Sequence, residues 1–179
     1  MSNLVEQLKA TVRSVPDFPI PGILFRDISP IFLDPNLLQA CPVALADPWR
    51  EQGITKVVGI DSRGFLFGPQ MAVELGAGFV MIRKKGKLPP ETISVSYSLE
   101  YGEAELESVA TSIEAGDRVL IHDDLLATGG TAAAAASLVK KLGGEVVGFS
   151  FIIHLTYLPG QEAIEPHSES LHALLAFEE

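Results

Sequence analysis

The feature of the sequence that most restricts its fold is a regular alternation of short apolar runs with amphipathic stretches between residues 56 and 153. Runs that are apolar throughout are typical of parallel strands, because crossover helices cover both faces of such a sheet. The sequence therefore predicts an α/β fold with a central, mostly parallel sheet flanked by helices. Strands are expected at 56–60, 78–82, 118–121 and 145–153, and helices at 64–75 and 131–142.

The two ends of the chain follow this alternation less clearly. Residues 3–13 have the apolar spacing of a helix, and three prolines between residues 16 and 21 then force an extended loop. A second helix is expected around residues 36–52, after an Asp-Pro start signal. Residues 159–179 are interpreted as irregular. With 179 residues and no tract that resembles a linker, the chain is expected to form a single domain.

Charge and cysteine content limit the classes of partner. The formal net charge is -10, so there is no general basic field to displace counterions from nucleic acid. No apolar run approaches the ~18 residues that a membrane span needs, and the single cysteine excludes an internal disulfide. We therefore expect a cytoplasmic protein with no nucleic-acid or membrane partner. Four of the 13 basic residues nevertheless lie within residues 83–87, which fits either a small anionic ligand or a solvated basic loop.

A first polar junction, Gly-Ile-Asp-Ser-Arg-Gly at 59–64, follows the first apolar run. Its glycines have the separation found in a Walker A loop, but Phe-Leu at 65–66 stands where that loop needs Lys and Ser/Thr. Ser62 lies in a near match to a nucleophile elbow, but Ile60 replaces the first required glycine. The residues alone leave two interpretations, an anion-binding helix start or an ordinary turn capped by Asp61.

A second junction follows the apolar run at 118–121. Two adjacent carboxylates, Asp123 and Asp124, precede the turn Ala-Thr-Gly-Gly-Thr at 127–131, which opens an alanine-rich helix. The N–H groups and hydroxyls of such a turn can surround a phosphate, and the helix dipole favours the anion. Ionised carboxylates only accept hydrogen bonds, which suits the hydroxyls of a sugar attached to that phosphate. The alternative is a pair of aspartates that simply caps a turn.

This second junction resembles the phosphoribosyl pyrophosphate signature of the type I phosphoribosyltransferases. Further motifs, from about residue 4 to about residue 158, resemble the members of that family that act on adenine; they lie at 15–19, 21–30, 61–65, 83–88 and 97–102. Two features depart from the family pattern. His122 stands where many relatives carry a small aliphatic residue, which would place a titratable group beside Asp123, and residues 108–111 lack a histidine often found there.

The resemblance implies transfer of a phosphoribosyl group from 5-phosphoribosyl 1-pyrophosphate to adenine, giving AMP and pyrophosphate. It also implies a homodimer and Mg²⁺ bound through the substrate, with no metal ligand directly from the protein. Within a single domain of residues 1–179, residues 1–35 would form a base-binding hood and residues 83–102 a flexible lid. The alternatives are a non-catalytic sensor of the same sugar phosphate and an enzyme that uses another purine or pyrimidine.

The resemblance further implies roles for individual residues. Two are implied to be catalytic: Glu100, as proton partner of adenine N7, and Arg63. The ribose phosphate would contact Asp123, Asp124, Ala127, Thr128, Gly129, Gly130 and Thr131. The pyrophosphate would contact Asp61, Ser62, Arg63, Gly64, Arg83, Lys84 and Lys87. Adenine would lie between Phe25 and Leu125, with its edge read by backbone groups of Leu24 and Arg26. Tyr101 would belong to the lid.

Overall fold

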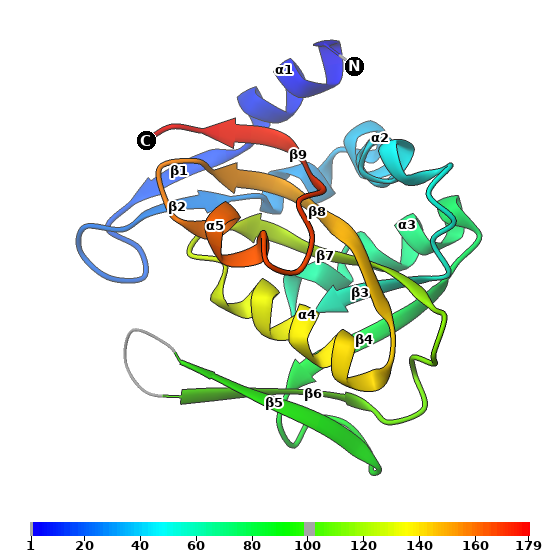
Figure 1. The fold of residues 1–179 in the computed structure, drawn as a ribbon. Helices are drawn as coiled ribbons and strands as arrows, with labels where there is room; N and C mark the ends of the chain where they lie inside the picture. The colour runs from blue at the N-terminus through cyan, green and yellow to red at the C-terminus, as the bar shows by residue number, and fades with distance from the viewer. Residues whose placement is uncertain (1, 99–102) are drawn as a thin grey trace.

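The computed structural model describes residues 2–98 and 103–179, and its main element is a seven-stranded sheet (Figure 1). The strand order is β5-β6-β4-β3-β7-β8-β9. All neighbouring pairs from β4 to β9 are parallel, and β6 pairs antiparallel with both β4 and β5. The expected mostly parallel sheet is therefore confirmed. The strands are β3 (Lys56–Ile60), β4 (Gly78–Lys84), β5 (Thr92–Ser98), β6 (Glu103–Val109), β7 (Arg118–Leu126), β8 (Glu145–Leu155) and β9 (Leu171–Phe177).

Helices cover both faces of this sheet. Val57 of β3 packs in a cluster with residues of three helices on one face, whereas the next residue, Val58, packs with a fourth helix on the other. This alternation explains why the strands are apolar throughout. Among the described residues, none of the helices has the length and apolarity that a bilayer crossing requires. The first three helices are α1 (Ser2–Thr11), α2 (Pro35–Ala46) and α3 (Gly68–Leu75), and the fourth is α4 (Gly130–Leu142).

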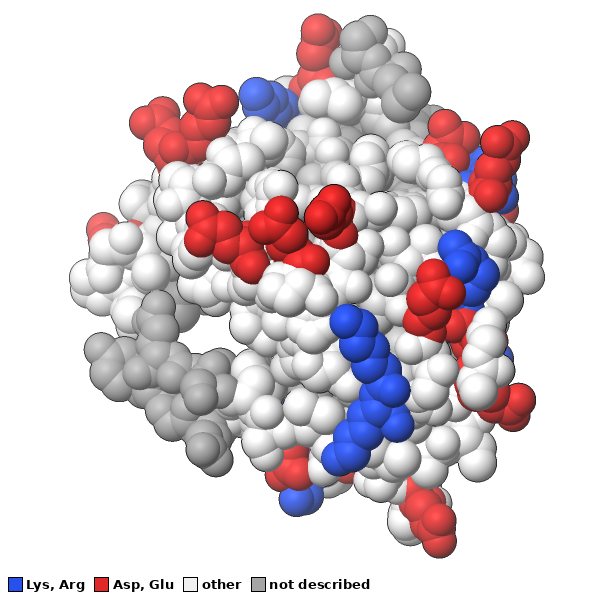
Figure 2. Space-filling model, viewed as in Figure 1, with Lys and Arg blue, Asp and Glu red and all other residues white. Residues whose placement is uncertain are grey.

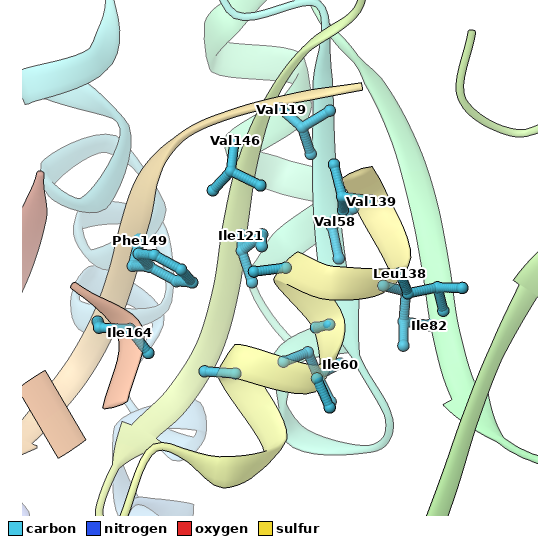
Figure 3. Close-up of a cluster of buried hydrophobic side chains, with 14 of the residues drawn as sticks. Val58, Ile60, Ile82, Val119, Ile121, Leu138, Val139, Val146, Phe149 and Ile164 are labelled. Carbon is cyan, nitrogen blue, oxygen red and sulfur yellow. The ribbon is translucent and has the colours of Figure 1, made fainter. Parts of the chain in front are cut away.

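The packing of α4 fixes the part of the fold that carries the second junction. Leu138 and Val139 point from α4 into a buried cluster with Val58, Ile82 and Ile121 (Figure 3). Small side chains elsewhere on the helix let its backbone approach the sheet closely; they are Ala132, Ala134, Ala135 and Ala136, all buried. Since the start of α4 directly follows β7, this packing holds the amino-terminal end of the helix at the carboxyl end of the sheet.

Several expected boundaries are wrong. The helix expected at 64–75 begins only at Gly68, with Pro69 in its first turn, after a 3₁₀ turn, η3 (Arg63–Phe65). The helix expected around 36–52 ends at Ala46 and is followed by the 3₁₀ turn η2 (Asp47–Trp49). The strand expected at 118–121 continues to Leu126 because it pairs with β8 as far as Leu126 and His154. Asp123 and Asp124 therefore lie within β7 and not after it.

The interpretation of residues 159–179 as irregular is also wrong. This region contains α5 (Gly160–Ile164) and β9, which adds a parallel strand beside β8. The run Leu-His-Ala-Leu-Leu-Ala-Phe at 171–177 is mostly apolar, as expected for a strand that is half-covered by neighbours. The last part of the chain therefore completes the sheet.

A separate hairpin of β1 (Arg13–Pro16) and β2 (Leu24–Asp27) leads into the 3₁₀ turn η1 (Ser29–Leu33). Arg13 lies opposite Asp27, and its Nε donates to Asp27 Oδ2 at 3.0 Å. The backbone N–H of Ser29 donates to Asp27 Oδ1 at 2.8 Å. Hydrogen bonds from Ser29 and Arg13 lower the pKa of Asp27 to about 2. One carboxylate thus ties the two strands to the following turn.

We predict that Asp27→Asn destabilises the fold at neutral pH by about 1 to 3 kcal/mol, since a charge-assisted bond is lost. Because the folded pKa is depressed, the contribution of Asp27 is present above about pH 4 and is lost as the pH falls toward 2. Thermal unfolding at pH 7 and near pH 2 measures the difference. Asp34→Asn is the control, because asparagine caps α2 about as well as aspartate. Equal unfolding temperatures for parent and Asp27→Asn at pH 7 would contradict the assignment.

Candidate active site

A cavity of about 620 Å³ opens at the carboxyl ends of β3 and β7. These strands pair only as far as Gly59 and His122, after which β7 continues along β8. The chain after β3 turns toward β4, where the Asp61 N–H donates to the carbonyl oxygen of Ile82 at 2.9 Å. Such a divergence is where open α/β sheets bind ligands. The cavity is lined by Phe18, Phe25, Asp61, Ser62, Arg63, Lys84, Tyr97, Ala104, Leu106, Asp123, Asp124 and Thr131.

A smaller pocket of about 110 Å³ adjoins this cavity and shares Asp123 and Thr131 with it. Its wall includes all of residues 127–131. Gly129 has φ 79, and a Cβ at this position would lie 2.6 Å from the carbonyl oxygen of Gly160. In the part of the chain that the structure describes, no side chain caps α4, so the N–H groups of its first turn are free of a capping group, and its first residues, Gly130 to Ala132, line this pocket. The pocket has the chemistry of a phosphate site.

The two aspartates of β7 both line the large cavity, and Asp123 also lines the smaller pocket. Asp124 is 3% exposed, and its N–H donates to Asp123 Oδ1 at 2.9 Å. Burial, and then the neighbouring Asp124 charge, raises the pKa of Asp123 well above its ordinary value. Burial also raises the pKa of Asp124, although Arg63 opposes the shift. The structure therefore holds two carboxyl groups side by side whose charged form is unfavourable. Hydroxyl groups of a ligand could donate hydrogen bonds to their oxygen atoms.

Arg63 connects these carboxylates to the aromatic wall of the cavity. Its Nε lies 2.9 Å from Asp124 Oδ2 in an ion pair that is not aligned as a hydrogen bond. Its guanidinium carbon lies 5.2 Å from the centroid of the Phe25 ring, a cation–π distance. Phe18, on the loop of the β1–β2 hairpin, meets Phe25 edge-on with centroids 5.0 Å apart. The hairpin therefore supplies an apolar wall opposite the carboxylates.

The turn at 59–64 packs tightly against both neighbouring strands. A Cβ on Gly64 would lie 2.7 Å from the carbonyl oxygen of His122, and one on Gly59 would lie 2.6 Å from the Phe79 ring. The two glycines are therefore needed for close packing. In a Walker A loop, by contrast, glycines are needed so that the backbone can wrap around a phosphate. The Asp61–Ser62 peptide bond in this turn is cis.

The cations expected at the pyrophosphate are distributed around this turn. Arg83 donates from Nε to Asp61 Oδ2 at 2.8 Å and from Nη1 to the carbonyl oxygen of Lys87 at 3.1 Å. Lys84 lines the large cavity, whereas Arg83 and Lys87 do not. Gly64 likewise contacts β7 and does not line the cavity. Of the seven residues expected at the pyrophosphate, the structure thus brings four together in the cavity wall: Asp61, Ser62, Arg63 and Lys84. Gly64, Arg83 and Lys87 are not part of that wall.

The residues expected around adenine are only partly gathered. The Arg26 guanidinium points away from the cavity, where it donates to Ser14 Oγ and the main-chain oxygen of Glu179 and lies 4.1 Å from the Phe177 ring centroid. Leu24 is exposed, and Leu125 lines the smaller pocket and not the larger one. Glu100 and Tyr101 lie outside the described residues.

Four residues of the cavity wall were not expected: Phe18, Tyr97, Ala104 and Leu106. Tyr97 and Ala104 are paired across the antiparallel strands β5 and β6, whose residues alternate between two faces. This alternation was the signal that could have placed Tyr97 on the cavity side. Phe18 stands in an irregular loop with no such signal.

The expectation that His122 adds a titratable group beside Asp123 is wrong. The His122 ring is fully buried, and its Nδ1 lies 2.9 Å from the carbonyl oxygen of Ser150. Burial lowers the pKa of His122 to about 4, so the ring is neutral at physiological pH.

Figure 2 shows the charge on one face of the molecule. Acidic side chains gather there in several separate groups, and basic side chains form one narrow band and a few isolated positions. Among the residues described on this face, the basic side chains form no wide surface, in agreement with the net negative charge of the chain.

Comparison with known proteins identifies the class to which this architecture belongs. Residues 31–167 match the family model described as the phosphoribosyl transferase domain. The chain therefore belongs to the phosphoribosyltransferase family.

Similar proteins place it more narrowly within that family. A protein from Nitrosococcus oceani named adenine phosphoribosyltransferase is 49% identical over 173 residues, which cover 97% of this chain and 100% of that protein. The crystal structure of adenine phosphoribosyltransferase from Rhodothermus marinus is 52% identical, with a TM-score of 0.92 and coverage of 99% and 100%. The Saccharomyces cerevisiae enzyme, crystallised with an imino-altritol bisphosphate and adenine, is 40% identical, with a TM-score of 0.91 and coverage of 98% and 100%. This chain is thus a member of the adenine phosphoribosyltransferases.

We predict that Asp123→Asn raises the unfolding temperature of the ligand-free protein at pH 7 while it weakens sugar-phosphate binding. The raised pKa means that the folded state favours the protonated carboxyl, so the charge costs stability once the pH exceeds the ordinary value near 4. The gain from the neutral amide should be about 1 kcal/mol or more at pH 7 and shrink toward pH 4.

Asp117→Asn is the matched control. The pKa of Asp117 is lowered because hydrogen bonds from Glu114 N–H and the Thr55 hydroxyl outweigh its burial, so this substitution should destabilise the protein. A lower unfolding temperature for Asp123→Asn at pH 7 would show that its charge does not oppose folding.

Proposed function

We propose that this chain catalyses the reaction of adenine with 5-phosphoribosyl 1-pyrophosphate to give AMP and pyrophosphate. The observation that carries the proposal is the pair of adjoining pockets joined at Asp123 and Thr131. One pocket has the amide-lined form of a phosphate site, and the other combines carboxylates, cations and an aromatic wall. Family membership supports the same reaction.

The ribose 5-phosphate would span the two pockets. Its phosphate would accept hydrogen bonds from the N–H groups of residues 127–131 and from the hydroxyls of Thr128 and Thr131, at the positive end of the α4 dipole. Its ribose hydroxyls would donate to Asp123 and Asp124. Asp124 Oδ2 has no hydrogen-bond partner among the described residues, so a hydroxyl donor would satisfy a buried acceptor.

The pyrophosphate would lie over the turn at 61–64, within reach of Arg63 and Lys84. As pyrophosphate leaves, C1 of the ribose develops positive charge and the leaving group gains negative charge. Fixed cations and backbone amides stabilise that charge without reorganising. The cavity is open to solvent, so exclusion of water from the reactive carbon would need a segment that closes over it. Arg83, held by Asp61, would position this turn.

The residues present fit Mg²⁺ brought by the substrate. Magnesium prefers oxygen ligands and retains several waters, and the cavity offers carboxylates at Asp61, Asp123 and Asp124 that can accept from those waters. Within residues 2–98 and 103–179, no three His, Cys, Asp or Glu side chains cluster as a metal site of their own. When bound, the metal would neutralise pyrophosphate charge.

Adenine would lie against Phe25, whose ring faces the cavity beside Phe18. Since the Arg26 side chain points away, only main-chain groups of Leu24 and Arg26 can read the base edge from this strand. Attack by N9 on C1 then needs adenine held in line with the departing pyrophosphate.

The remaining parts of the proposal rest on the family resemblance. They are Glu100 as proton partner of adenine N7, Leu125 on the second face of the base, residues 1–35 as a hood, residues 83–102 as a lid, a homodimer, and a cytoplasmic location. Lid closure would exclude water during the reaction.

We predict that Gly129→Val and Asp124→Asn each weaken binding of 5-phosphoribosyl 1-pyrophosphate by at least about tenfold, measured by calorimetry. Valine at φ 79 is strained, and its side chain would collide with Gly160, so the loop could not keep this conformation. The side-chain amide introduced by Asp124→Asn would offer only one acceptor oxygen to the ribose. Gly53→Val is the control, because Gly53 also has a positive φ but does not line the cavity, so it should cost stability and leave binding intact. Parent-like affinity in both site variants would place the sugar phosphate elsewhere.

We also predict that the parent protein prefers adenine over hypoxanthine by a factor on the order of 10⁴ in kcat/KM, because hypoxanthine inverts the donor and acceptor at positions 6 and 1. Arg26→Gln should lower activity without changing this preference. Pyrophosphate release with adenine, hypoxanthine, guanine and orotate tests both points. Similar rates with adenine and hypoxanthine would refute the edge-reading arrangement, and no release with any base would favour a non-catalytic sensor.

A further inference from the structure

We infer that α5, through Gly160 and Ala163, is a brace that holds the 127–131 loop in its phosphate-binding conformation. This inference rests on the proposed function, because it assigns a positioning role to residues outside the site itself. No role for residues 159–179 is expected from the sequence.

The first observation is the contact between Gly160 and the start of the loop. Gly160 is buried, and a Cβ built on it would overlap the carbonyl oxygen of Ala127 and lie 2.8 Å from the Leu126 side chain. Backbone therefore meets backbone here, with no room for even one methyl group. The position of Ala127 depends on the absence of a side chain at residue 160.

The second observation is the reverse contact, from the middle of the loop to α5. A Cβ on Gly129 would lie 2.6 Å from the carbonyl oxygen of Gly160 and 2.7 Å from Cβ of Ala163. Glycine is thus required on both sides of the same contact. Two segments 31 positions apart interlock through their main chains.

The brace is itself held firmly. Ile164 is 1% exposed and packs in the same buried cluster as α4. The Ala163 N–H donates to the carbonyl oxygen of Pro159 at 3.1 Å, and the Leu158 N–H donates to that of Leu155 at 3.1 Å. These bonds connect α5 to the end of β8, the neighbour of β7 in the sheet.

The loop needs this support because its own residues do little to stabilise its conformation. The N-cap residue of α4, Gly129, is in the left-handed conformation, and a glycine has no side chain that could hold it there. α5 contacts the loop at Ala127 and Gly129, two of the residues that line the smaller pocket. Preorganised amides bind phosphate without the entropic cost of ordering the loop.

The test compares Gly160→Ala and Ala163→Val with the parent. Each adds volume against the loop, and overpacking of this kind should raise KM for 5-phosphoribosyl 1-pyrophosphate and Kd for ribose 5-phosphate about tenfold, equivalent to about 1.4 kcal/mol. We expect KM for adenine and kcat at saturation to change less than about twofold, because the base and the reacting carbon contact other segments. Ala163→Val provides the measurement should Gly160→Ala fail to fold.

Two controls separate positioning from stability. Ile54→Val removes a buried methylene group from the other cluster, which includes neither α4 nor α5, so it should lower the unfolding temperature and leave Kd for ribose 5-phosphate unchanged. Gln161→Ala, at an exposed position of α5, should change neither quantity.

The outcomes also distinguish this inference from the proposed function. Unchanged Kd for ribose 5-phosphate in both Gly160→Ala and Ala163→Val would overturn the brace, as would an equal loss in Ile54→Val. A parent protein that binds ribose 5-phosphate but forms no AMP would refute the proposed reaction, and the binding comparison would still decide the brace.

Discussion

The candidate site depends on the point at which β3 and β7 stop pairing. Their parallel register ends at Gly59 and His122. Beyond it β3 turns toward β4, whereas β7 keeps its ladder with β8 to Leu126. The opening between the diverging chains is the cavity, and the continued ladder is what carries Asp123 and Asp124 into it. Packing of α4 on the same strands then brings an uncapped helix start to the same edge.

The same divergence explains the unusual charges of the site. The two aspartates lie on the part of β7 that pairs with β8 alone, and burial there raises the pKa values of both. Arg63 offsets part of this cost by pairing with Asp124. The fold thus accepts a local loss of stability at the position where sugar hydroxyls would bind, a compromise that is common at functional sites.

The sequence predicts the sheet well because the strands are buried on both faces, so their apolar runs are continuous and easily recognised. It predicts the length of β7 poorly, since Asp123 and Asp124 look like the end of a strand and only pairing with β8 extends it. It misses β9 because that segment becomes a strand by pairing with β8. It misses α5 because five residues are too few to show a helical period. Asp123, Asp124 and the 127–131 loop can be grouped from the sequence because they are contiguous, and the structure places them around two adjoining pockets. Phe18 and Tyr97 reach the same cavity from distant segments through tertiary packing, which local patterns do not reveal.

The ion pair between Arg63 and Asp124 has a consequence for which anions can enter. A simple anion that attracts Arg63 away would leave Asp124, with its side chain 4% exposed, as an unpaired buried charge, which is costly. A sugar phosphate that brings hydroxyls to Asp124 replaces the lost partner at the moment it takes the arginine. In the proposed site the pair therefore favours a ligand that brings both an anionic group for Arg63 and hydroxyl donors for Asp124, as a sugar phosphate does.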